Sequence, residues 1–139
     1  MLFRSIWIGG ESPVALKRAV RVGDGWYPAS NNPQHRLDTP ERLGKGVSEL
    51  RRVAEAAGRD PGTIDVGFLV LWPVDWTAQK SADGARRLLT GRSEDKAADI
   101  AALERAGVRH ICLTFQTASL SETLERMQRF ANEVMPLAR

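Results

Sequence analysis

Residues 6–13, which read IWIGGESP, constrain the fold of this chain more than any other segment. Their apolar beginning favours a short strand, and the two glycines that follow end it. Ser12 is a good helix N-cap, and Pro13 suits the first helical position. We therefore expect a strand, a tight turn and the start of a helix in direct succession, as in a βα unit.

The turn of this unit is also the first candidate binding site. Gly9 and Gly10 let the backbone approach a ligand closely, and the unpaired N–H groups of a helix N-terminus attract anions such as phosphate. A βα turn that needs its glycines for geometry alone would contain the same residues. The local sequence leaves both interpretations open.

Short apolar strands alternate with helical segments along the chain, which is typical of βα units and a parallel sheet. Gly23, Gly58 and Gly107 are expected to end helices. Four strands, each followed by a helix, make an α/β fold equal to half of a (β/α)8 TIM barrel. The expected strands cover residues 5–8, 25–27, 63–71 and 110–115, and the main helices cover 13–22, 40–57, the stretch between a cap at 92–95 and Gly107, and 120–135.

The third strand is the strongest of these, because residues 64–71 are almost all apolar, as in a parallel strand covered on both faces. Pro73 lacks the N–H that a strand requires, so we expect the strand to end before it. Trp72 and Trp76 then lie in a loop, where they either stack on a ligand or pack the loop. A short helix is expected over residues 78–89.

Two further features are expected to be buried. Leu124, Met127, Phe130 and Val134 recur at helical spacing in the last helix, which predicts a stripe that faces the core. Cys112 lies within a short apolar run, which favours a small buried side chain rather than a nucleophile.

Length and charge limit the remaining classes of protein. A chain of 139 residues is expected to form a single domain over residues 1–139. Its net charge of +3 comes from acids and bases that are mixed along the chain, which argues against a nucleic-acid partner. The single cysteine fits a reducing cytoplasm, and no cluster of histidine and cysteine predicts a metal site. The apolar stretch near the N-terminus is too short for a signal peptide or a membrane span, so we expect a cytoplasmic protein without membrane contact.

Several segments follow one another in an order and spacing that extend over essentially the whole chain. They are residues 6–12, 15–19, 23–28 (GDGWYP), 57–61 (AGRDP), 91–95 (GRSED), 106–110 (AGVRH) and 134–137 (VMPL). Together they resemble the C-terminal half of luciferase-like monooxygenases and F420-dependent oxidoreductases, the bacterial luciferase-like superfamily. The N-terminal half of that family has no counterpart in these residues.

This resemblance implies a cofactor at the C-terminal mouth of the barrel, which is coenzyme F420 or, alternatively, the flavin FMN. In relatives that use F420, the turn that matches residues 9–12 approaches the phosphate of the coenzyme. Gly9, Gly10 and Ser12 are therefore expected to bind the cofactor. Glu11 is expected to contribute its backbone amide, since its carboxylate would repel a phosphate.

The resemblance also marks the segment that begins at Gly23. Asp24 is expected to join a turn to backbone amides, with a general acid or base as the alternative. Trp26 and Tyr27 either line a pocket for a small-molecule substrate or fill the core. His35 is the histidine best placed to carry a proton. Catalytic residues of relatives come largely from the other half, so none is assigned here.

A half barrel by itself exposes the inner face of its sheet and two edge strands. We therefore expect a homo-oligomer, most simply a homodimer; a truncated product or one half of a split protein is the alternative. The implied function is that of a luciferase-like, F420- or flavin-dependent oxidoreductase or monooxygenase, which transfers hydride or activates oxygen on a small organic substrate. The rival is a non-catalytic dimerising half barrel that at most binds a phosphate-bearing ligand.

Overall fold

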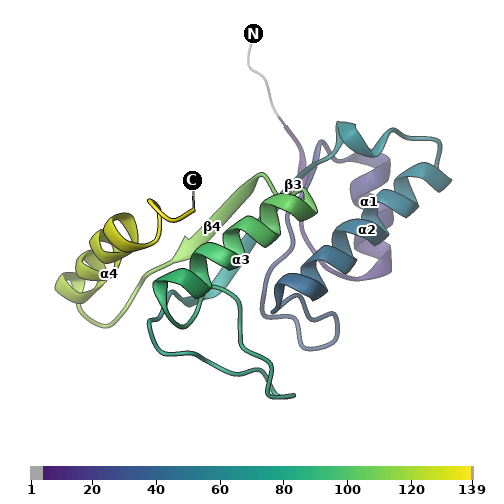
Figure 1. The fold of residues 1–139 in the computed structure, drawn as a ribbon. Coiled ribbons are helices and arrows are strands. Elements are labelled where there is room, and N and C mark those ends of the chain that lie inside the picture. The colour runs from purple at the N-terminus through teal and green to yellow at the C-terminus, as the bar shows by residue number, and fades with distance from the viewer. Residues whose placement is uncertain (1–4, 139) are drawn as a thin grey trace, which may run out of the picture.

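A computed structural model describes residues 5–138 (Figure 1). It contains a parallel sheet of four strands. The strands lie side by side in chain order: β1 (Trp7–Ile8), β2 (Gly25–Trp26), β3 (Asp65–Pro73) and β4 (His110–Thr114). Trp26 is paired with Val66, and Phe68 with Ile111. Strands in this order are those of successive βα units in a barrel, so the expected α/β half barrel is confirmed.

Four helices and a 3-10 turn connect or follow these strands, and their first residues are set by the expected caps. The Ser12 hydroxyl oxygen accepts from the Ala15 N–H at 3.2 Å, and the Thr39 hydroxyl oxygen accepts from the Arg42 N–H at 3.3 Å. The elements are α1 (Pro13–Val22), α2 (Pro40–Ala56), η1 (Pro61–Thr63), α3 (Ser93–Ala106) and α4 (Leu120–Glu133). No helix among residues 5–138 is long and apolar enough to cross a membrane.

The main core lies between one face of the sheet and the first three helices. Val66, Phe68 and Val70 of β3 are buried there, because alternate side chains of a strand point to the same face. The Trp26 ring joins them, and Gly46 of α2 leaves space for it, since a Cβ at position 46 would lie 3.1 Å from that ring. The helices complete the core with Leu16, Leu43, Leu50 and Leu103.

The opposite face, which we call the inner face, carries Trp7, Tyr27, His110 and Cys112. The Trp7 ring meets the Tyr27 ring edge to face at 6.0 Å and the His110 ring at 5.5 Å. The expectation that Cys112 is buried is wrong, because its side chain is on this uncovered face and is exposed. The cysteine does belong to an apolar strand, but only the other face of that strand meets the helices.

Two glycines allow the aromatic rings to lie close to the strands of the inner face. A Cβ on Gly25 would lie 2.6 Å from the Trp7 ring, and a Cβ on Gly67 would lie 2.5 Å from the Tyr27 ring. Real Cβ atoms do not approach so closely, so a side chain at either position would displace the rings. The glycines therefore position the aromatic cluster of the inner face.

The third strand differs from the prediction in two respects. It continues to Pro73, which is paired with Thr114 after an irregular register, and the Thr114 hydroxyl donates to the Val70 carbonyl at 2.7 Å. Proline is tolerated there because it ends the strand. The strand is also covered on one face only, since Leu71 is 42% exposed.

The helix expected over residues 78–89 is absent, and this segment is an irregular loop. Its N–H groups donate to distant partners instead of to the preceding turn: Arg87 to the Gln79 carbonyl, Leu88 to the Asp38 carbonyl and Leu89 to the Asp99 carboxylate. Leu89 has a φ of 59°, a strained value for a leucine, and the hydrogen bond that its N–H donates to Asp99 stabilises this conformation. Tertiary hydrogen bonds have replaced the helical ones.

The last helix is less buried than its apolar stripe predicted. Phe130 and Val134 pack against Val74, but Leu124 is 55% exposed and Met127 is 48% exposed. In Figure 1, α4 lies apart from the layer formed by α1, α2 and α3. The expectation of a fully buried stripe is therefore confirmed only at its C-terminal end.

Candidate functional site

Three connections meet at the edge of the sheet formed by the carboxyl ends of the strands. They are the turn of residues 9–12 after β1, the loop of residues 28–38 after β2, and the end of β3 with the loop that follows it. Because the strands are parallel, these connections lie at the same edge, which is where βα barrels bind their ligands. This edge is therefore the candidate site.

The turn after β1 has one glycine that its geometry requires. Gly10 has a φ of 98°, and a Cβ there would lie 2.9 Å from the Ala15 Cβ, so both the backbone angle and the space call for glycine. Gly9 is less restricted, since a Cβ would meet only the Tyr27 carbonyl oxygen, at 3.6 Å. Ser12 is occupied as the cap of α1.

Trp26 determines how the peptide between Gly10 and Glu11 is oriented. Its indole N–H donates to the Gly10 carbonyl oxygen at 2.8 Å, which directs that carbonyl toward the core. In a trans peptide the N–H points opposite to the carbonyl, so the Glu11 N–H points away from the core. The N–H groups of Glu11 and Ser12 bond to no other residue in the described part of the chain, so both can donate to an anion.

The Glu11 carboxylate joins the turn to the next loop by hydrogen bonds. It accepts from the Ala29 N–H at 2.7 Å and from the Asn32 side-chain amide at 2.8 Å. Asn32 in turn accepts from the N–H groups of Gln34 and His35 at 2.9 and 3.1 Å. The carboxylate is therefore turned toward residues 29–32, and the turn and the loop are held as one unit.

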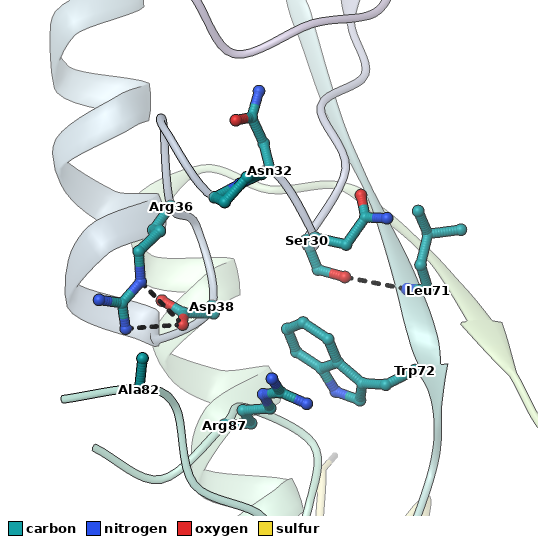
Figure 2. A pocket seen from close by; sticks show the side chains of 10 residues that line it. Ser30, Asn32, Arg36, Asp38, Leu71, Trp72, Ala82 and Arg87 are labelled. Atoms are coloured by element: carbon teal, nitrogen blue, oxygen red, sulfur yellow. Dashed lines mark hydrogen bonds and ion pairs between the residues drawn. The ribbon is translucent and has the colours of Figure 1, made fainter. Parts of the chain in front are cut away.

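A pocket of about 470 Å³ lies beside this unit (Figure 2). Trp72, at the end of β3, and Arg87, from the irregular loop, lie next to each other at its border, with the Arg87 Cζ atom 5.3 Å from the centre of the Trp72 ring. The residues that line the pocket are Ser30, Asn31, Asn32, Pro33, Arg36, Asp38, Leu71, Trp72, Ala82 and Arg87. The sequence left ligand stacking and loop packing open for Trp72, and it did not single out Arg87, which lies where a helix was expected.

An ionic network forms one side of this pocket. Asp38 accepts from Arg36 at 3.0 Å and from Arg42 at 2.6 Å, and both arginines also pair with Asp83. The bond from Arg36 lowers the pKa of Asp83 to about 2. Burial alone would raise the pKa of Asp38, but hydrogen bonds from Ser81 and the two arginines hold that pKa below its ordinary value. Both carboxylates are therefore charged near neutral pH.

The structure separates the two aromatic residues that the sequence placed together. Trp26 is 1% exposed and fills the core, which was the expected alternative to lining a substrate pocket. Tyr27 is half-buried on the inner face, where burial and the neighbouring Cys112 thiol raise the pKa of its hydroxyl. Tyr27 as a substrate-pocket residue stays a prediction.

Asp24 has a structural contact of the kind that the sequence favoured. Its carboxylate accepts from the Ile6 N–H at 2.7 Å, next to the start of β1. His35 is half-buried in the loop after β2 and contributes its backbone N–H to the Asn32 side chain. Both residues therefore make structural hydrogen bonds, and neither bond depends on a role as a general acid or base.

The architecture and the site define the class of protein: half of a βα barrel, with its loops gathered at the carboxyl ends of the strands. Within that class, the sequence profile described as luciferase-like monooxygenase matches residues 3–134. The chain therefore belongs to the luciferase-like monooxygenase family, as the resemblance of its segments predicted.

Solved structures share this fold over almost the whole chain. The coenzyme F420-dependent tetrahydromethanopterin reductase of Methanopyrus kandleri superposes with a TM-score of 0.67 and 15% identity, and the match covers 97% of this chain and 51% of that one. An F420-dependent secondary alcohol dehydrogenase, solved with an F420–acetone adduct, gives a TM-score of 0.64 and 16% identity and covers 99% and 50%. A monooxygenase from Streptomyces bottropensis gives 0.56 and 19% and covers 95% and 47%.

The chain thus spans about half the length of these structures. At such identities the likeness shows the fold and not the reaction. A comparison with curated proteins gives no match.

Proposed function

We propose that this chain is the cofactor-binding half of a luciferase-like oxidoreductase, and that residues 9–12 bind the phosphate of coenzyme F420 or, alternatively, of FMN. Membership of the luciferase-like monooxygenase family supports an oxidoreductase or monooxygenase. Two structurally similar proteins are F420-dependent by name, which favours F420 over FMN. The substrate would be a small organic molecule in the adjacent pocket.

One observation carries this proposal: the Trp26 indole N–H donates to the Gly10 carbonyl at 2.8 Å, and the N–H groups of Glu11 and Ser12 have no partner within residues 5–138. A phosphate oxygen could accept from both N–H groups at the positive end of α1. The Glu11 carboxylate does not oppose this, because two hydrogen bonds hold it toward residues 29 and 32. The residues present therefore fit a phosphate.

The cofactor would supply the hydride or activate oxygen, and the residues of this chain would bind and orient it. Glu11 and Ser12 would hold the phosphate through their backbone, and Gly10 would permit its approach. The pocket of Trp72 and Arg87 would exclude water from a substrate bound beside the cofactor.

A fluorescence titration of the purified protein with F420, and in parallel with FMN, tests this proposal. Gly10→Val should weaken binding by about tenfold or more, because it moves the two donors, each worth about 1.5–3 kcal/mol to a charged group. Gly58→Val is the matched control: Gly58 also has a positive φ, of 71°, but no atom lies within 4 Å of its Cβ position and it follows α2. Equal affinity of wild type and Gly10→Val would contradict the site.

The open inner face favours a second candidate, a homodimer that covers this face and acts without catalysis. Trp7 is 36% exposed and Leu71 42%, and Cys112 is exposed on the same face, so this side of the sheet has an open apolar surface. A second copy of the chain would bury these side chains. In this function the turn after β1 would at most bind a phosphate-bearing ligand.

A further inference from the structure

The two arginines that line the pocket of Figure 2 differ in their surroundings. Arg36 is paired with Asp38 and Asp83 and is turned toward Asp38. Both of its partners also bind Arg42, so two positive charges are balanced by two negative ones. This network is closed, and it offers no unbalanced charge to a ligand.

Arg87 has no such partner in the described part of the chain. Its Nε atom is buried without a hydrogen bond, and no acidic side chain within residues 5–138 forms an ion pair with it. A buried donor without an acceptor costs about 1–3 kcal/mol, and such groups are rare in folded proteins. The neighbouring Arg86, in contrast, is bound by both Asp99 oxygens at 2.6 and 2.9 Å.

The position of Arg87 is nevertheless well defined. Its backbone N–H donates to the Gln79 carbonyl at 2.8 Å, and its carbonyl accepts from the Thr90 hydroxyl at 2.7 Å. The guanidinium lies against the Trp72 ring, whose own N–H donates to the Leu88 carbonyl at 3.1 Å. The Trp72 ring is thus fixed to Leu88, next to Arg87, and it holds the Arg87 guanidinium at the border of the pocket.

Part of the pocket wall is apolar and is formed by the Trp72 ring, the 42% exposed Leu71 and Pro33. Ser30, Asn31 and Asn32 add polar groups to the rest of the wall. An arginine matches the planar geometry of a carboxylate, and it binds that group most strongly where water is partly excluded. A pocket in which an arginine without a partner among the described residues lies beside an indole therefore fits a ligand with an anionic head and an apolar or aromatic body.

We infer that this pocket binds the carboxylate of an acidic organic substrate, with Arg87 on the carboxylate and Trp72 against the apolar body of the molecule. The inference rests on the proposed function, because it names the class of substrate that would lie beside the cofactor. Arg87 and Trp72 then determine specificity, and neutral molecules of the same shape bind weakly.

Titration of the 15N-labelled 139-residue chain with benzoate tests this inference, with NMR of the arginine Nε–Hε signals as the readout. Benzoate should shift the Arg87 signal until saturation and leave the Arg86 signal in place, since Asp99 already holds Arg86. Benzyl alcohol has the same aromatic body without the charge and should bind about ten- to a hundredfold more weakly, the value expected for loss of a charged hydrogen bond. R87Q and R87K lack this arginine signal, so their benzoate affinity is measured from the indole N–H signal of Trp72, which lines the same pocket. R87Q should weaken benzoate binding to the same extent, and R87K should weaken it less.

The outcome separates this inference from the proposed function. Unchanged cofactor affinity in R87Q, together with lost benzoate binding, supports an acidic substrate. Loss of F420 or FMN affinity in R87Q would overturn the inference, because Arg87 would then bind an anionic group of the cofactor. Absence of a benzoate shift at Arg87, or equal binding of benzyl alcohol, would also overturn it. Failure of the wild-type protein to bind either cofactor would refute the proposed function alone.

Discussion

The indole N–H of Trp26 donates to the Gly10 carbonyl oxygen at 2.8 Å and so joins β2 to the turn that follows β1. The two residues are 16 positions apart in the chain. The ring of Trp26 is buried between the sheet and α2, so this bond anchors the turn to the core. The orientation of the turn, and with it the candidate phosphate site, therefore depends on Trp26, a buried residue that does not line the site.

Trp26→Phe should therefore affect both stability and binding. The phenyl ring keeps most of the packing but leaves the Gly10 carbonyl without its donor, which should lower the free energy of unfolding by about 1–3 kcal/mol. Urea unfolding and the cofactor titration measure the two effects. Trp76→Phe is the control, since Trp76 donates to Ser93 and Glu133, away from the turn. Equal cofactor affinity in both variants would show that the bond does not orient the site.

Glu11→Ala should loosen the loop after β2. The carboxylate accepts from the Ala29 N–H and from the Asn32 side chain, so its removal should cost about 1–3 kcal/mol of stability. Hydrogen exchange of the Ala29 amide should become faster, whereas exchange in α2 should change little. Glu55→Ala, at an exposed position of α2, is the control. Unchanged protection of the Ala29 amide in Glu11→Ala would show that the Glu11 carboxylate does not hold this loop.

The stability of the protein should increase as the pH rises through mildly alkaline values, because the buried Lys96 then loses its charge. Its side chain is fully buried, near the Trp76 ring, and donates to the Gly91 carbonyl. Burial, and then Arg129, lower the pKa of Lys96 from 10.5 to about 8. The unfolded chain therefore binds the proton more tightly than the folded protein does. The resulting destabilisation, about 3 kcal/mol, is complete below pH 8 and disappears between about pH 8 and 10.5.

Lys96→Met removes this destabilisation and should raise the free energy of unfolding at pH 7 more than at pH 10. Urea unfolding at the two pH values, with the exposed Lys17→Met as a control, measures the difference. If Lys96→Met changes stability by the same amount at both values, Lys96 is not the titrating group.

Trp7→Lys should disrupt the homodimer that the open inner face favours. Trp7 lies on that face and is 36% exposed, so a charge there would oppose burial against a second copy. Analytical ultracentrifugation should show a dimer for wild type and for Val14→Lys, whose parent residue is 66% exposed on α1, and a monomer for Trp7→Lys. Cys112, exposed on the same face, should react more slowly with a thiol reagent in the dimer. A monomeric wild type would exclude this candidate.

Much of the fold could be predicted because its signals are local. The bounds of α1, the caps Ser12 and Thr39 and the helix stop at Gly107 depend on residues within a turn of one another. The predictions failed where distant residues compete. Residues 78–89 have helical composition, but their N–H groups bond to Asp38 and Asp99 instead.

The sequence by itself therefore determined the order of the βα units and the turn with its obligatory Gly10. The tertiary structure alone decided which side chains at the carboxyl ends of the strands are available to bind a ligand. The Glu11 carboxylate points to Ala29, 18 residues away, and Arg36 is neutralised by Asp83, 47 positions further on. Arg87 has no counter-ion within residues 5–138. The physical reason is that helix caps and turns form between neighbours in sequence, whereas charges and donors are satisfied by whatever the folded chain brings within about 3 Å.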